Sequence, residues 1–261
     1  MYPVPDIISP AEIIDSHAHY NDKRFDGIID GLMKKQKELG VKRIINCGCD
    51  FESIDACLRL GEKYDFCYTA VGFHPENLPE GDLDIERLRA LAALDKVCAI
   101  GEIGLDYYWR QDNKEAQKKA FCDQLRLAKD LGLPAIMHDR EAHGDTLDII
   151  REYRPKGVLH CFSGSREMAE ELVGLGIYIG IGGVLTFKNA KKLIEVAAAI
   201  PMDKILLETD APYLAPEPFR GKLNHSALII YVAERLAEIR GMRLEEVIRI
   251  TTENSEKLFS L

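Results

Sequence analysis

The sequence predicts a single (β/α)8 barrel, also called a TIM barrel, over residues 1–261. Eight short apolar runs alternate with helical patterns along the chain, as expected for parallel strands that are buried on both faces. The connections are short and marked by Gly or Pro, and the length of 261 residues is usual for one such barrel. An open doubly wound sheet is less favoured, because its first strand usually leads into a glycine-rich phosphate loop. Here the first strand ends in DSHAHY instead.

The elements are expected to follow one another as strand and helix throughout. The clearest helix covers 114–131, with Phe121 and Leu125 on one face, the cap candidate Asn113 before it and Gly132 after it. The expected strands are 12–14, 43–47, 66–71, 97–100, 134–137, 157–159, 177–181 and 204–207. The other expected helices are 27–39, 51–63, 83–95, 143–153, 165–175, 188–199, 226–240 and 243–259.

Composition and charge limit the classes of partner. Hydrophobic residues make up 46% of the chain, enough for a sizeable core, and 34 Lys and Arg against 43 Asp and Glu give a net charge of −9. This charge repels polyanions, so a nucleic-acid substrate would have to be bound through a few local contacts. The N-terminus lacks a basic segment followed by an apolar one, and no run of about 18 apolar residues occurs. We therefore expect a cytoplasmic protein without a membrane partner.

The seven cysteines are odd in number and scattered through apolar patterns, which favours reduced thiols over a disulfide framework. Cys47 and Cys49 form a C-x-C pair that could bind a metal. No second pair follows at a suitable spacing, so these two residues are interpreted as part of the packing.

Residues of metal-ligand type follow the apolar runs at several strand ends. In a parallel barrel the carboxyl ends of the strands meet at one rim, so these side chains should form one site. His17 and His19 are two apart on an extended strand and point to the same side. The complete set is His17, His19, Glu102, His138, His160 and Asp210. Six ligands exceed the four of one tetrahedral ion, so two divalent cations fit better, with Glu102 as the natural bridge.

The chain resembles the TatD-type metal-dependent hydrolases, a branch of the amidohydrolase barrels. The resemblance covers nearly the whole chain and is carried by DSHAHY (15–20), VGFHPE (71–76), GEIGLDYY (101–108), HDREA (138–142), HCFSGS (160–165), ETDAPYLAP (208–216), RGKLN (220–224) and TTENSEKLF (251–259). It implies a (β/α)8 barrel with His17, His19, Glu102 and Asp210 around one cation and Glu102, His138 and His160 around the other. It also implies that Asp210 takes a proton from the attacking water.

The identity of the two cations stays open at this level. Mixed nitrogen and oxygen ligands suit Zn, Mn, Co or Ni, and Mg is possible where waters complete the shell.

Further residues are candidates for binding substrate. His74, in the family motif, could donate to a phosphate or could cap its own loop. Arg220 and Lys222 follow the last strand, where barrels often hold phosphates, but they could also form a solvated basic loop. Tyr108 and Trp109 could stack on the bases of a single strand or pack as a lid.

Several positions leave alternatives open. Glu208 lies on the same strand side as Asp210, where it could hold a ligand imidazole or pair with a core Arg or Lys. His143 is expected at the surface or behind His138. Glu76 and His225 depart from the pattern usual in the family and are expected in substrate loops. The serines of HCFSGS lack the setting of a serine nucleophile.

The resemblance implies a deoxyribonuclease that cleaves phosphodiester bonds at short or single-stranded DNA ends by metal-activated water. Its catalytic residues would be Asp210, Glu102 and His74. A metal-dependent amide or ester hydrolase, for example an aminoacyl-tRNA deacylase, would use the same ligands and stays open as the alternative. A barrel without enzymatic activity is disfavoured, because four imidazoles and a buried carboxylate are costly without a metal. No obligate protein partner is implied.

Overall fold

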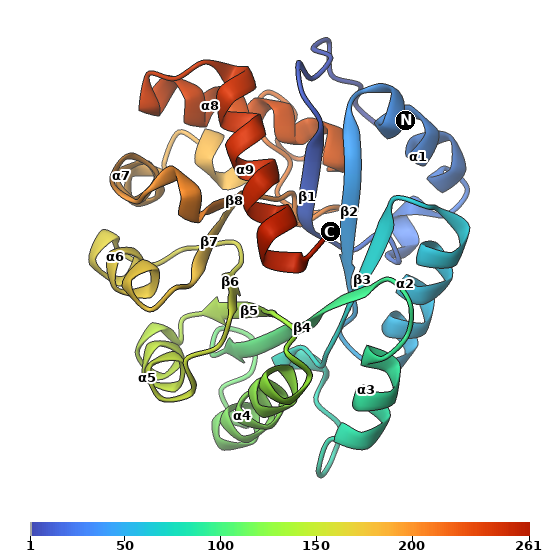
Figure 1. Ribbon diagram of the computed structural model, residues 1–261, viewed down its shortest axis with the longest axis vertical. Helices are drawn as coiled ribbons and strands as arrows, with labels where there is room; N and C mark the ends of the chain where they lie inside the picture. The colour runs from blue at the N-terminus through green and yellow to red at the C-terminus, as the bar shows by residue number, and fades with distance from the viewer. Residues whose placement is uncertain (1) are drawn as a thin grey trace.

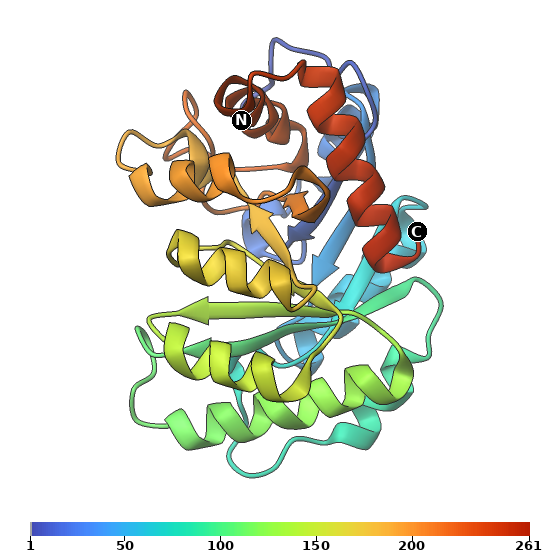
Figure 2. The same ribbon diagram turned by 60° about the vertical axis from the view of Figure 1, so that its left-hand side comes forward.

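The computed structural model describes residues 2–261 and shows eight parallel strands in the order in which they occur along the chain. Helices surround the strands on the outside (Figures 1 and 2). The predicted (β/α)8 barrel is therefore confirmed, with strands at all eight expected apolar runs. The strands are β1 (Ile13–Ala18), β2 (Val41–Cys47), β3 (Cys67–Val71), β4 (Val97–Asp106), β5 (Ala135–Arg140), β6 (Gly157–Leu159), β7 (Tyr178–Ile181) and β8 (Ile205–Leu207).

Each strand is followed by a helix, and one further helix completes the described chain. Thr252 and Asn254 of this last helix donate hydrogen bonds to the carbonyl oxygens of Glu12 (2.8 Å) and Ile205 (2.9 Å), at the starts of β1 and β8. This helix thus covers the seam between the first and last strands at the end where these strands begin. The helices are α1 (Ile29–Glu38), α2 (Phe51–Lys63), α3 (Ile85–Ala92), α4 (Lys114–Leu131), α5 (His143–Tyr153), α6 (Arg166–Gly174), α7 (Lys191–Ala199), α8 (Ile229–Arg240) and α9 (Leu244–Phe259).

The seam between β1 and β8 closes through a bridge between the end of β1 and the segment after β8. Ala18 and Ala211 form this bridge, and the backbone N–H of His19 donates to Ala211 O at 2.7 Å. The N–H of Asp210 donates to His17 O at 3.0 Å. Closing the barrel in this way places His17 of β1 and His19, just after it, beside the carboxylate of Asp210 that follows β8.

Strand β4 is longer than the apolar run 97–100 predicts. It continues to Asp106 because every residue after Val97 is buried and the pairing with β5 persists, with Gly104 opposite His138. Gly104 has φ of +147°, and a Cβ atom there would lie 2.0 Å from His138 O, so only glycine fits this close approach. As a result, Glu102 lies inside a strand rather than at its end.

The helix boundaries agree closely with the predicted ones, with two differences. Gly132 ends α4 in the left-handed conformation, as expected, but the side chain of Asn113 does not cap the helix. It accepts a hydrogen bond from Gln117 Nε2 instead. The expected helix 226–240 begins as a 3-10 turn, η5 (Ser226–Leu228), before α8. None of the helices in residues 2–261 is long and apolar enough to cross a membrane.

His225 does not line a substrate loop, contrary to the expectation from its departure from the family pattern. Its side chain is buried, with 1% exposure, and Nε2 lies 2.7 Å from Pro3 O. The ring also meets Tyr2 edge-on at 5.7 Å. It therefore anchors the N-terminal segment to the barrel.

Stability should fall in acid through His225. Burial lowers its pKa from 6.5 to about 4, so between these values the unfolded chain binds the proton more readily than the folded one. The stabilisation is complete above pH 6.5 and is lost as the pH falls towards 4, by about 3 kcal/mol in all. Urea unfolding of His225→Gln in chelator should show a weaker loss of stability over this interval than the wild type.

His143→Gln is the matched control for this prediction. A hydrogen bond to Asp139 raises the pKa of His143, so its contribution to stability is present below pH 6.5 and lost as the pH rises. The two variants should change the slope of stability against pH in opposite directions. Parallel slopes for wild type and His225→Gln would rule out the role given to His225.

Candidate metal centre

The six predicted ligand residues converge on the carboxylate of Glu102. Oxygen Oε2 of Glu102 lies 3.4 Å from His17 Nε2 and 3.5 Å from His19 Nε2. Asp210 Oδ1 completes this first set, 3.4 Å from His19 Nε2 and 3.7 Å from His17 Nε2. Two imidazoles and two carboxylates facing a common point are a donor set that suits a divalent transition-metal ion.

The second oxygen of Glu102 faces a different pair of histidines. Oε1 lies 2.8 Å from His138 Nδ1 and 2.7 Å from His160 Nε2, and these two nitrogens are 3.1 Å apart. The two oxygens of one carboxylate thus each meet a separate ligand set. His, Glu and Asp side chains gathered in this way fit a site for divalent metal.

Hydrogen bonds behind the first set fix which ring nitrogen faces Glu102. His19 Nδ1 lies 3.0 Å from Cys47 O, an acceptor, so Nδ1 carries the hydrogen and Nε2 is left as a bare lone pair. Cys47 Sγ lies 3.3 Å from His17 Nδ1 and orients that ring in the same sense. Both imidazoles therefore present a metal-binding nitrogen to the centre.

Asp106 performs the same task for His138. Its Oδ2 lies 3.3 Å from His138 Nε2 and holds the ring with Nδ1 toward Glu102. The other oxygen of Asp106 accepts hydrogen bonds from the backbone N–H groups of Tyr108 (2.9 Å) and Trp109 (2.8 Å). One carboxylate thus joins a ligand histidine to the aromatic loop after β4.

Glu208 lies behind His160. Its Oε1 is 3.9 Å from His160 Nδ1 and accepts a hydrogen bond from the N–H of Cys161 at 2.5 Å. Among the described residues no Arg or Lys pairs with Glu208, so the alternative of a core salt bridge with such a residue is wrong. Burial raises the pKa of Glu208 to about 8, which favours the neutral acid at this position.

His74 differs from the four ligand histidines in the nitrogen that it presents. The N–H of Glu76 donates to His74 Nδ1 at 3.2 Å, so the hydrogen of this ring sits on Nε2. Nε2 lies 3.5 Å from Glu102 Oε1. Of the two sequence-based alternatives for His74, the cap is confirmed, because Nδ1 caps the 3-10 turn η2 (Pro75–Asn77). Donation of Nε2–H to a phosphate stays a prediction.

The charge of Glu102 is maintained by its neighbours. Burial alone would raise the pKa of Glu102, but the charges of His160, His74 and His17 outweigh burial and hold the pKa well below its ordinary value. Burial, followed by the charge of His160, lowers the pKa of His17 to about 4. The other ligand histidines shift the opposite way. Burial would lower the pKa of His138, but its hydrogen bonds with Asp106 and Glu102 outweigh burial and raise it to about 10. The pKa values of His19 and His160 are raised as well. Metal binding would therefore displace protons from these rings.

Replacing Asp106 by asparagine should weaken metal binding. The amide introduced by Asp106→Asn cannot accept from His138 Nε2 with the strength of a carboxylate, so the ring loses its fixed orientation. We expect metal affinity to fall by roughly 10- to 100-fold, measured by competition with a chelating dye. Asp139→Asn is the control, because Asp139 is the neighbour of His138 in sequence but bonds His143 Nδ1 at 2.5 Å. Equal affinities for both variants would remove Asp106 from the centre.

The expected substrate residues lie at different distances from the centre. Tyr108 and Trp109 are exposed by 52% and 58% and meet edge-on at 4.8 Å, so they do not pack as a buried lid. The guanidinium of Arg140 lies 4.3 Å from the centre of the Tyr108 ring. Arg220 is exposed and lies 4.3 Å from the ring of Phe187, and Lys222 is exposed as well. No contact of Arg220 or Lys222 with the predicted ligands is found within residues 2–261.

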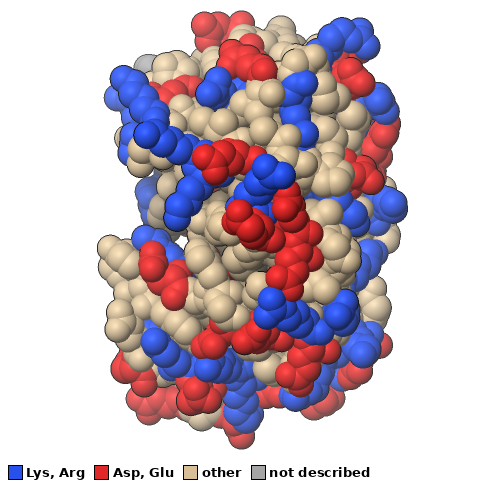
Figure 3. Space-filling view, turned by 90° about the vertical axis from the view of Figure 1, so that its left-hand side faces the viewer, with Lys and Arg blue, Asp and Glu red and all other residues tan. Residues whose placement is uncertain are grey.

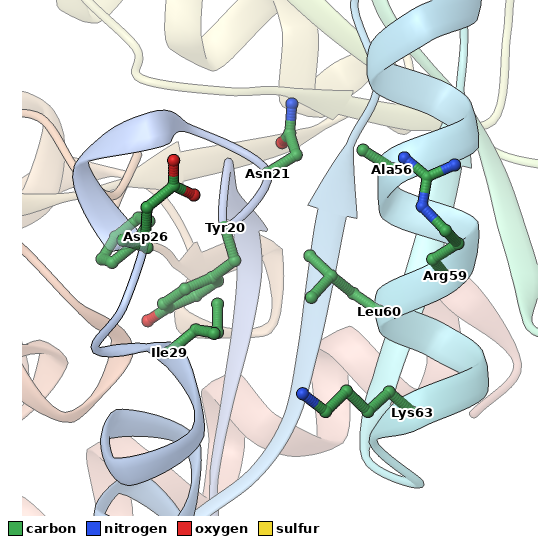
Figure 4. Close-up of a pocket in the computed structure, with 9 residues that line it drawn as sticks. Tyr20, Asn21, Asp26, Ile29, Ala56, Arg59, Leu60 and Lys63 are labelled. Atoms are coloured by element: carbon green, nitrogen blue, oxygen red, sulfur yellow. The ribbon is translucent and has the colours of Figure 1, made fainter.

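A separate groove of about 230 Å³ lies outside the barrel, between α2 and the segment that leads into α1. Tyr20 follows His19 in the chain but turns away from the centre into this groove, opposite Leu60 and Arg59 of α2 (Figure 4). Lys63 at its edge is paired with Asp30 at 2.5 Å. The groove therefore lies apart from the ligand cluster.

Sequence reasoning missed two contributors to the centre, Asp106 and Cys47. Asp106 lies four residues after Glu102, so the two would share one side of an extended strand, and this spacing was available as a signal. Cys47 supplies a carbonyl oxygen and a sulfur to two imidazoles. A carbonyl contact of this kind depends on the twist of neighbouring strands and leaves no mark in the sequence.

The fold and the donor cluster together define a metal-dependent hydrolase of the barrel class, and comparison with known proteins gives the family. The family described as TatD related DNase matches residues 14–260, and the chain belongs to this family. It is 42% identical to the uncharacterized metal-dependent hydrolase YabD of Bacillus subtilis, over 95% of this chain and 99% of that protein. It is 37% identical to YcfH of Escherichia coli, over 95% and 96% of the two chains.

A solved structure supports the same assignment. The crystal structure of YjjV, a TatD homologue from Escherichia coli, matches with a TM-score of 0.89 at 34% identity, covering 95% of this chain and 98% of that one. The family resemblance stated from the motifs is thus confirmed.

Proposed function

We propose that this hydrolase cleaves phosphodiester bonds at the ends of short or single-stranded DNA. The strongest support is the set of contacts around Glu102. One oxygen faces His17, the other faces His160, and the donor nitrogen of His74 faces the same carboxylate. Bound divalent cations would supply Lewis acidity toward a phosphoryl oxygen and would lower the pKa of a water molecule. The family description, TatD related DNase, points to the same class of bond.

The residues of the chain then have distinct tasks. Glu102 holds the two ligand sets together, with His17, His19 and Asp210 on one side and His138 and His160 on the other. Asp210, at the mouth between β8 and β1, accepts the proton of the attacking water. His74 Nε2–H donates to the phosphate as charge develops on its oxygens. Arg220 and Lys222 would contact phosphates farther along the strand.

The charge distribution favours a small footprint on the substrate. On the face that carries α5, α6 and α7, basic side chains gather at the upper left, and basic and acidic side chains intermingle over the lower half (Figure 3). Together with the net charge of −9, this fits a protein that binds a strand end through a few contacts. We place this activity in the cytoplasm, where the seven free cysteines would stay reduced.

The direct test compares bond classes on one preparation. Protein loaded separately with Zn²⁺, Mn²⁺, Co²⁺, Ni²⁺ or Mg²⁺ is incubated with an end-labelled single strand, the matching duplex, and a panel of aminoacyl esters and N-acyl amides. We expect stepwise shortening of the single strand with at least one metal and slower attack on the duplex. Turnover of an acyl substrate without any cleavage of DNA would replace this proposal by the amide or ester hydrolase.

The aromatic loop should contribute to binding through Trp109. This residue is the only tryptophan of the chain and is exposed, so its fluorescence should respond when a base stacks on it. Trp109→Ala should weaken the binding of a labelled single strand by about 1–3 kcal/mol, roughly 5- to 150-fold in Kd, measured by anisotropy in chelator. Trp109→Phe should retain most of the affinity, and Leu94→Ala, an exposed apolar residue elsewhere, should retain all of it. Unchanged affinity for Trp109→Ala would contradict the stacking role.

A further inference from the structure

The loop after β2, residues 47–49, is built into the wall of the metal centre. Gly48 O accepts the backbone N–H of Glu102 at 3.0 Å, and Cys49 O accepts that of His74 at 3.0 Å. The N–H of Cys49 donates to Ser53 Oγ at 2.8 Å. The backbone on both sides of Cys49 is therefore fixed by neighbours, whatever side chain this position carries.

The thiol of Cys49 lies within reach of ligands from two other strands. Its Sγ atom, one ligand nitrogen of His19 and one oxygen of Glu102 all lie within 4.8 Å of one another. Sγ is 4.0 Å from His19 Nδ1, and the residue is half-buried. Three ligand-type side chains from β1, β4 and the loop after β2 thus converge, which is a cluster rather than an isolated cysteine.

The other cysteine of the pair is placed differently. Cys47 is fully buried, and its Sγ lies 3.3 Å from His17 Nδ1. Its carbonyl oxygen orients His19 from behind. Cys47 therefore positions the imidazoles, whereas only Cys49 is grouped with the carboxylate of Glu102 itself.

We propose that Cys49 supplies a thiolate ligand to a cation held together with His19 and Glu102. On coordination the thiol gives up its proton to solvent and sulfur donates a lone pair to the ion. A sulfur ligand favours Zn²⁺ and Co²⁺ over the harder Mg²⁺ and Mn²⁺. The C-x-C pair is then a selectivity element and not only packing. This inference rests on metal binding in the proposed function but not on which bond is cleaved.

Cobalt loading tests the proposal through its spectrum. Cobalt bound by a thiolate shows a near-ultraviolet charge-transfer band that nitrogen and oxygen ligands do not give. We expect the band in the wild type and in Cys122→Ser, a half-buried cysteine on α4, and its loss in Cys49→Ser with cobalt still bound by elemental analysis. Wild-type protein that binds cobalt without the band, or a band that persists in Cys49→Ser, would overturn the proposal.

A second measurement needs no variant and guards against misfolding of Cys49→Ser. X-ray absorption of the wild-type zinc protein should show a sulfur scatterer at about 2.3 Å in addition to nitrogen and oxygen at about 2.0–2.2 Å. A shell of nitrogen and oxygen alone would refute the thiolate ligand. Cleavage of DNA by such a sulfur-free centre would leave the proposed function standing, while a sulfur ligand without DNA cleavage would refute only the function.

Competition between metals gives the expected size of the effect. Cys49→Ser should lower the affinity for Zn²⁺ by at least the roughly 10- to 100-fold that loss of a supporting residue costs at metal sites, with little change for Mn²⁺. The ratio of the two dissociation constants is the readout, because a general disturbance of the site would weaken both ions alike. An unchanged ratio would count against the proposal.

Discussion

Glu102→Ala should abolish the metal centre as a whole. Because its two oxygens face both ligand sets, with contacts of 3.4 and 3.5 Å on one side and 2.8 and 2.7 Å on the other, its loss leaves four imidazoles without the shared carboxylate. We expect elemental analysis to show loss of bound metal, and the rate of hydrolysis to fall by on the order of 1000-fold or more. Among the carboxylates of the cluster, Glu102 is the one whose two oxygens face histidines of both sets.

Two companion variants separate charge from position. Glu102→Gln keeps the shape of the side chain but removes the charge that offsets two cations, so it should also lose metal. Glu76→Gln removes an exposed carboxylate at the same mouth, 4.0 Å from His74 Nδ1, and should keep the metal content of the wild type. Full metal content in Glu102→Ala would show that the two ligand sets are independent of the carboxylate that joins them in space.

The sequence was sufficient to predict the barrel and the convergence of its polar residues. In a parallel barrel the strand order and direction place all carboxyl ends at one rim, so His17, Glu102 and Asp210 had to approach one another once the apolar runs were recognised as strands. Membership in the metal-dependent TatD-related family supports the same cluster. The order and direction of the strands thus predicted that these residues meet, although no single contact between them was known.

What the sequence could not supply were contacts that depend on small shifts in register. The extension of β4 to Asp106 rests on the close approach of Gly104 to His138, and it is this extension that carries Asp106 to the far side of the imidazole. Similarly, the burial of His225 against Pro3 depends on the course of the N-terminal segment. A departure from a family pattern identifies such a position but not the direction of its side chain.

The same limit applies to Cys49. Spacing alone favoured packing for the C-x-C pair, because metal-binding cysteines usually come in two pairs. The structure places its thiol near His19 and Glu102, residues from strands far away in the sequence. Neighbours that are so far apart in the sequence can be identified only from the structure.

Asp210→Asn should separate binding of the metal from turnover. The amide oxygen of asparagine can still face His19 and His17, as Asp210 Oδ1 does at 3.4 and 3.7 Å, so the first ligand set keeps a donor in place. An amide cannot accept a proton near neutral pH, and loss of a general base typically costs about 100- to 10,000-fold in rate. We expect wild-type metal content with this loss of kcat in single-turnover assays.

Asp210→Ala provides the contrast that assigns the role. Alanine removes both the donor atom and the proton acceptor, so metal and activity should fall together in this variant. If Asp210 acted only as a ligand, the activity of each variant would follow its metal content, and saturating metal would restore Asp210→Asn to a near-normal rate. Such a rescue would remove the proton-acceptor role. If Asp210→Asn stays slow with both ligand sets occupied by metal, Asp210 acts as the proton acceptor, because this substitution changes no other group at the mouth of the barrel.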